Sequence, residues 1–275
     1  MKWINLKAIM LLAIGIFACP SRVFGVSDDL YTFRSGIHIG SESSRTDKQL
    51  EQVLTSLRLV TGLTEINVAN NEMTLGNRLH INGGSKTARE LIIATLDSGD
   101  SFMLERRDNS STISFAQIES TARYVDASGK RHSEWQLRID FSDFEELVGD
   151  TKARAAFNPA INILHELAHA VFGYLDPYDG NDTLGECERY INQIRFELGL
   201  PQRVYYYPHY SLATGQVDLT FVKAELMFVE ARAEGRKPRE LFVHFNVEKV
   251  FDFSKARSRT TIQASLLAQR RAQGR

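Results

Sequence analysis

Residues 158–173 read NPAINILHELAHAVFG, and this stretch carries the clearest helix signal in the chain. Asn158 is a strong N-cap residue, and Pro159 suits the first helical position, where its missing N–H removes no hydrogen bond. The residues that follow are mostly apolar, and Gly173 is a typical stop signal. The sequence therefore predicts a helix from Pro159 to about Phe172.

The helix contains the pattern H-E-x-x-H. His165 and His169 are four residues apart, so both imidazoles project from one face and can reach a single ion. Glu166 projects beside them, close enough to touch a metal-bound water without binding the metal. Imidazole ligands, a carboxylate and an open position for water suit catalytic Zn²⁺. Zinc lowers the pKa of that water, and the carboxylate of Glu166 can accept its proton during attack on a carbonyl.

The alternative is that the two histidines are ordinary hydrogen-bonded core residues. The rest of the helix is strongly apolar, so His165, Glu166 and His169 would have to be buried together. Burying them without partners costs free energy, and one bound metal ion satisfies all three. We therefore predict one zinc ion per chain.

A catalytic zinc site needs a third protein ligand, and the next predicted helix, residues 184–198, offers two. Glu188 borders the apolar stripe of that helix, and Glu186 is its rival. Asp179 and Asp182, in the intervening loop, are weaker candidates. Asn192 lies four residues after Glu188 and could hold a ligating histidine through its free ring nitrogen.

The spacing resembles a known family. Eighteen residues separate His169 from Glu188, as in the gluzincin branch of zinc peptidases, in which the downstream Glu is the third ligand. Residues 158–207 also resemble bacterial zincin-like effector and toxin-associated peptidases. The resemblance implies a zincin-like fold, bound zinc, Glu188 as third ligand and peptide hydrolysis. It also suggests Tyr206 as a group that stabilises an oxyanion, although a packed aromatic role fits as well.

The remaining patterns predict an α+β fold with an antiparallel or mixed sheet. Apolar residues repeat at helical spacing from Leu50 to Val60, and a second helix is expected over 87–97. Strands are predicted over 101–106, 112–117, 122–125, 134–141, 217–222 and 241–251. We interpret the four central strands as an antiparallel meander or a pair of hairpins. The segment 139–141 is a candidate edge strand for an extended substrate.

The two ends of the chain differ from its centre. Lys2 and Lys7 precede an apolar run over 8–18, which is typical of a secretory signal ending near Gly25. A lipoprotein signal with Cys19 lipidated is the alternative. Residues 255–275 are basic, without acids, and predict a disordered tail or a segment that contacts anionic lipid. The expected organisation is a signal over 1–25, one domain over 26–254 and the tail, in an exported protein.

Charge and motif together limit the function. The formal net charge of −1 gives the chain no general attraction to nucleic acid. The leading hypothesis is a zinc metallopeptidase acting on a peptide or protein. Hydrolysis of a non-peptide amide or ester would use the same residues, and a non-catalytic secreted metal-binding protein is the third possibility.

Overall fold

The computed structural model describes residues 33–40, 48–110, 115–177, 182–212, 222–234 and 236–246. From Arg34 onward these belong to one compact unit. The predicted signal over 1–25, Cys19 and the basic tail over 255–275 lie outside the described residues. Within the described part, no helix combines the length and the apolar character needed to cross a bilayer.

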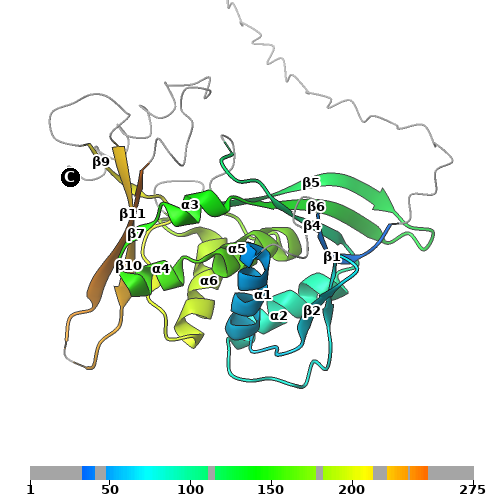
Figure 1. Cartoon of the computed structure of the whole chain (residues 1–275), viewed down its shortest axis with the longest axis horizontal. Coiled ribbons are helices and arrows are strands. Elements are labelled where there is room, and N and C mark those ends of the chain that lie inside the picture. Colours follow the sequence, from blue (N-terminus) through cyan, green and yellow to red (C-terminus); the bar gives the residue numbers. More distant parts are fainter. Residues whose placement is uncertain are drawn as a thin grey trace, which may run out of the picture. The chain divides into compact units, whose positions relative to one another are not determined.

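A six-stranded mixed sheet is the larger of the two sheets in this unit (Figure 1). Neighbouring strands β1 and β4, and β4 and β6, are parallel, and the remaining pairs are antiparallel. The α+β class with a mixed sheet is thus confirmed. In spatial order the strands are β2 (Ile66–Ala69), β3 (Glu72–Leu75), β1 (Gly36–Ile39), β4 (Ser101–Arg106), β6 (Arg131–Ile139) and β5 (Ala116–Val125).

Three helices pack against one face of this sheet: α1 (Lys48–Thr61), α2 (Lys86–Asp97) and α5 (Pro159–Phe172). A fourth, α6 (Gly185–Glu197), packs on α2 and α5. All four were predicted to within two residues at each end, because each has an apolar stripe and a glycine stop signal within two residues of its end. The central core fills the space between these helices and the sheet. The helix that carries H-E-x-x-H is therefore held on several sides.

A second, smaller sheet is built from strands that come after the six-stranded sheet in the sequence. In its spatial order the strands are β7 (Val148–Gly149), β11 (Arg239–Asn246), β10 (Val222–Glu230) and β8 (Gln202–Arg203), with β9 (His209–Leu212) also paired to β10. The short helices α3 (Phe141–Glu145) and α4 (Thr151–Ala156) precede α5, and α4 packs on β11. This sheet has its own apolar cluster. The predicted strand over 217–222 lies outside the described residues except Val222.

The predicted meander is only partly correct. The two predicted strands over 112–117 and 122–125 form a single strand, β5, with an irregularity between Ser120 and Ala122, and residues 111–114 are not described. β5 and β6 form the expected hairpin, but β4 lies parallel to β6. Alternation along a strand reveals which face is buried, not which strand lies beside it. The edge strand next to α5 is therefore β5, and β6, which contains Ile139, is internal.

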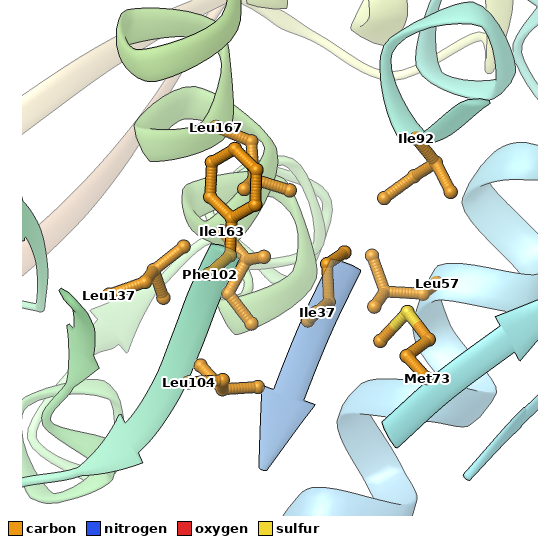
Figure 2. Close-up of a pocket in the computed structure, with 9 residues that line it drawn as sticks. All are labelled: Ile37, Leu57, Met73, Ile92, Phe102, Leu104, Leu137, Ile163 and Leu167. Carbon is orange, nitrogen blue, oxygen red and sulfur yellow. The ribbon is translucent and has the colours of Figure 1, made fainter. Parts of the chain in front are cut away.

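A small apolar cavity of about 10 Å³ lies between the sheet and the helices (Figure 2). That is about the volume needed for one water molecule, but a water there would have no polar partners. The cavity is a gap in core packing beneath the helix that carries H-E-x-x-H. Its lining residues are Ile37, Leu57, Met73, Ile92, Phe102, Leu104, Leu137, Ile163 and Leu167.

Two leucines of α1 provide a matched test of this core. The Leu57 side chain lines the cavity with 1% of its surface exposed, whereas Leu59, two residues later, is 71% exposed. Leu57→Ala should lower the free energy of unfolding by about 2–5 kcal/mol, because it enlarges an existing gap. Leu59→Ala should change it by less than about 0.5 kcal/mol. Urea unfolding of both variants checks this, and equal effects would contradict the described packing of α1.

One buried carboxyl group makes stability depend on pH. Asp143, in α3, is 3% exposed. Burial raises its pKa, the backbone N–H of Phe115 lowers it, and Asp140, Asp108 and Glu146 raise it further, to about 7. The folded protein therefore binds a proton that the unfolded chain releases near pH 4. Stability should fall as pH rises from about 4 to about 7.

Asp143→Asn should remove this part of the pH dependence. The amide oxygen can still accept the hydrogen bond from the N–H of Phe115, which is 2.8 Å from Asp143 Oδ2 in the wild type. The variant should gain stability relative to wild type as pH rises, by at most about 4 kcal/mol at pH 8. Urea midpoints measured from pH 4 to pH 8 test this. A constant difference between the two proteins would contradict the prediction.

Candidate metal centre

The two ends of α5 are fixed by the residues that predicted them. The side chain of Asn158 accepts a hydrogen bond from the N–H of Ile161 at 3.0 Å. Gly173 ends the helix in the left-handed conformation, with φ of 68°, and its N–H donates to the carbonyl of His169. Gly173 turns the chain sharply after the motif, so that residues 174–177 pass back alongside it.

The two histidine rings face each other. The Nε2 atoms of His165 and His169 are 3.1 Å apart. Each Nδ1 faces a different oxygen atom. The carbonyl oxygen of Tyr174 lies 2.6 Å from Nδ1 of His169, and Oε2 of Glu188 lies 3.3 Å from Nδ1 of His165. When each Nδ1 carries the proton and donates it, a neutral imidazole presents only a lone pair at Nε2. Two lone pairs then point at one place, which is the arrangement that a metal ion requires.

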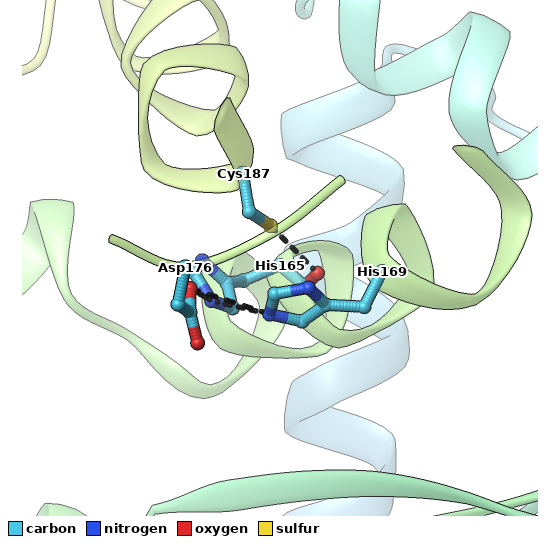
Figure 3. Close-up of side chains that lie close together, drawn as sticks. All are labelled: His165, His169, Asp176 and Cys187. Carbon is cyan, nitrogen blue, oxygen red and sulfur yellow. Dashed lines mark hydrogen bonds and ion pairs between the residues drawn. The ribbon is translucent and has the colours of Figure 1, made fainter. Parts of the chain in front are cut away.

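Asp176 supplies a third atom (Figure 3). Its Oδ1 lies 3.3 Å from Nε2 of His165 and 3.4 Å from Nε2 of His169. Three ligands of a tetrahedral zinc ion with bonds of about 2.0–2.1 Å lie about 3.3–3.4 Å apart. Oδ1 is buried, and no described residue gives it a well-aligned hydrogen bond. The three atoms thus form a triangle of the size that zinc needs.

The path from α5 to α6 explains why Asp176 reaches the histidines. The carbonyl of Leu175 accepts hydrogen bonds from the N–H groups of Glu186 and Cys187 at the start of α6. Gly185 has φ of +73°, and a Cβ there would lie 2.7 Å from the carbonyl carbon of Asp176. A glycine is therefore needed at 185 for the chain to pass so close to α6. The loop is pinned on both sides of Asp176.

Cys187 completes a group of four potential ligands. One ligand atom from each of His165, His169, Asp176 and Cys187 lies within 4.8 Å of every other. Cys187 is fully buried and comes from α6, and its thiol donates to the backbone carbonyl of His165 at 3.2 Å. A group of this kind could bind a metal ion. A thiol must lose its proton before it can do so.

The electrostatics of the group favour positive charge. Burial, the largest single effect, lowers the pKa of His169, but its contacts with Asp176 and Cys187 together outweigh burial and the pKa rises to about 10. Burial raises the pKa of Asp176, but the two histidines outweigh it and bring the pKa well below its usual range. A carboxylate that stabilises protonated imidazoles would equally stabilise a bound cation between them.

Glu166 lies beside the histidines and is half-buried. Burial raises its pKa, whereas His165 and His169 lower it, and the net change is upward. The backbone N–H of Ile118, on edge strand β5, interacts with the same carboxylate. Glu166 therefore lies between the two histidines and the outer edge of β5. A carboxylate with a raised pKa suits proton transfer near neutral pH.

The predicted third ligand, Glu188, is not part of the group of four. It is 1% exposed, and its Oε1 accepts a hydrogen bond from Arg195 in the same helix. Its Oε2 approaches His165 at Nδ1, the ring nitrogen that does not face Asp176. Asn192 does not hold a histidine as we expected. It accepts from Arg195 and from the N–H of Arg203.

The other candidate carboxylates also lie elsewhere. Glu186 accepts a hydrogen bond from the N–H of Leu175 at 3.3 Å. Asp182 binds Arg189 and the N–H groups of Leu184 and Gly185. Asp179 lies outside the described residues.

Asp176 was not among the ligands predicted from the sequence. The signal that could have identified it is its position, directly after the turn at Gly173 and seven residues from His169.

Tyr206 contacts two members of the group. Its hydroxyl donates to Oδ2 of Asp176 at 2.6 Å, and its ring stacks on that of His165 with centroids 5.9 Å apart. The guanidinium of Arg203 lies over the Tyr206 ring, 5.3 Å from its centroid. Tyr206 therefore orients Asp176. The suggested role in stabilising an oxyanion stays a prediction.

No protein-family model, no characterised protein and no solved structure matches this chain.

Proposed function

We propose that this protein is a zinc-dependent hydrolase that cleaves peptide bonds. His165, His169 and Asp176 are the ligands, and Glu166 is the general base. The observation that carries the proposal is the triangle of Nε2, Nε2 and Oδ1 atoms with edges of 3.1, 3.3 and 3.4 Å. Two imidazoles and one carboxylate, with a fourth position for water, are a ligand set of catalytic zinc sites.

The residues present fit this ion. Asp176 offers a buried oxygen without a well-aligned donor, and both histidines present Nε2 to it. A zinc ion held there supplies Lewis acidity and lowers the pKa of its bound water. Glu166 then takes a proton from the attacking water as that water adds to the carbonyl carbon of the substrate. The same carboxyl group passes the proton to the leaving nitrogen when the C–N bond breaks.

The outer edge of β5, which no described strand pairs, favours a peptide over a small ester or amide. β5 lies at the end of the six-stranded sheet and packs beside α5. An exposed strand edge offers a row of N–H and C=O groups to which an extended peptide can bind. The interaction of the Ile118 N–H with Glu166 brings that edge within reach of the general base.

One observation favours a second function. Cys187 is close enough to the other three residues to serve as a fourth ligand. A zinc ion with four protein ligands is typical of structural sites and leaves no position for water. Cys187→Ala separates the two functions: a hydrolase keeps its zinc and its activity, whereas a closed site loses affinity for zinc.

Zinc content and peptide cleavage, measured together, test the proposal. Wild type and His165→Ala are purified, offered zinc, analysed for metal and incubated with a quenched fluorescent peptide library. About one zinc per chain and cleavage in wild type, both lost in His165→Ala, are expected. A folded wild type that binds no zinc would refute the metal site. One bound zinc without cleavage of any peptide would leave the site in place and refute the peptidase.

A further inference from the structure

We infer that Glu188 positions His165 from behind rather than binding the metal, and that two buried arginines keep its carboxylate charged. The inference rests on the proposed metal site but not on peptide cleavage. Glu188 Oε2 is 3.3 Å from Nδ1 of His165, while Nε2 of the same ring lies 3.3 Å from Asp176. The two ring nitrogens point in different directions, so the ring lies between the two carboxylates.

The charge balance around Glu188 explains why it stays ionised. The side chains of Arg195 and Glu188 are 2% and 1% exposed, respectively, and they form a hydrogen-bonded ion pair. Nη1 of Arg203 lies 3.6 Å from Oε2 on the other side, and that arginine is also buried. Two cations therefore surround one anion. This excess of positive charge favours the carboxylate over the carboxylic acid, which could not accept as well from an imidazole N–H.

Each arginine is held independently of Glu188. Arg195 donates to the carbonyl of Ala156 at 2.8 Å and lies over the ring of Phe228. Arg203 donates to the carbonyl of Tyr205 at 2.9 Å and lies over the ring of Phe157. The two groups that fix Glu188 thus come from α6 and from β8 of the smaller sheet.

The consequence for His165 is a fixed tautomer. A carboxylate that accepts the Nδ1 proton leaves Nε2 as the lone-pair nitrogen, makes that nitrogen a better ligand and holds the ring in one orientation. His169 has the neutral counterpart, the carbonyl of Tyr174. Of the two Nδ1 atoms, only that of His165 faces a charged acceptor, so the affinity of His165 for metal should depend on residue 188.

Glu188→Gln tests the inference, with Glu186→Gln as the matched control on the same helix. Zinc affinity is measured by competition with a chelator. The Glu188 variant should still bind one zinc ion but about 10–100-fold more weakly, and the control should match wild type. The Co²⁺-loaded proteins are then examined by NMR, in which ring N–H protons of ligating histidines give separate, strongly shifted signals. One of the two signals should move or broaden in Glu188→Gln, and the other should stay.

Three results with Glu188→Gln would overturn the inference. Complete loss of metal in Glu188→Gln with retention in Asp176→Asn would make Glu188 the ligand. Unchanged affinity, or unchanged N–H signals, would leave it without a positioning role.

If Glu188→Gln does not fold, the double variant Glu188→Gln/Arg203→Met restores the charge of the cluster, and Arg203→Met is its reference. The same 10–100-fold difference is expected between those two, and equal affinities would refute the inference. Because every readout is metal binding, failure of peptide cleavage leaves the inference intact.

Discussion

Glu166→Gln should lower peptide hydrolysis by about 10²–10⁴-fold while one zinc ion remains bound. Gln has nearly the shape of Glu but cannot accept a proton from water. Glu166 has no place in the group of His165, His169, Asp176 and Cys187, so its substitution should not change metal content. Initial rates on a peptide selected from the library, with zinc analysis of the same sample, check this.

The reference for that experiment is His165→Ala, which should lose activity and metal together. Activity close to wild type in Glu166→Gln would show that another group activates the water. Loss of zinc from Glu166→Gln would place this carboxylate among the ligands and would contradict its assignment as a base.

Asp176→Asn should weaken zinc binding by more than about 100-fold, beyond the range typical of residues that only support a ligand. The amide keeps the shape of the side chain and can still accept the hydroxyl proton of Tyr206. It lacks the negative charge that faces both histidines. Competition with a chelator at pH 7.5 measures the change in affinity.

Asp182→Asn is the matched control, because Asp182 belongs to the same connection but binds Arg189 and the start of α6. It should bind zinc as wild type does. Equal affinities for Asp176→Asn and wild type would show that Asp176 is not a ligand, and Glu186 and Glu188 of α6 would again be the candidates for the third ligand.

The helices could be predicted from the sequence because their signals are local. Apolar spacing identified α1, α2 and α6, and for α5 the Asn-Pro start and Gly173 also marked the ends. The parallel pairing of β4 with β6 and the short strands β1 to β3 were not predicted, because they depend on partners distant in the chain. Strands of four residues are too short for a reliable alternating pattern.

The candidate site likewise contains residues that local sequence patterns predict and residues that depend on tertiary structure. His165, Glu166 and His169 follow from helical spacing, which fixes where their side chains point. The choice of Glu188 depended on a spacing shared with a family, and spacing cannot reveal that Arg195 lies against that carboxylate. Asp176 depends on the path of a loop, which the backbone conformation at Gly173 and Gly185 determines. Such a path is a tertiary property and has no periodic signal.

The outer edge of β5, left unpaired by the described strands, also has a consequence for how copies of this chain behave at high concentration. An unpaired edge can join the same edge of another copy and start aggregation. The irregularity between Ser120 and Ala122 interrupts β5, and exposed Glu119 and Arg123 lie on either side of it. Bulges and charged side chains oppose continuous pairing between sheets. The regular part of the edge, from Ala116 to Ser120, is long enough for a short guest segment but too short for a long intermolecular sheet.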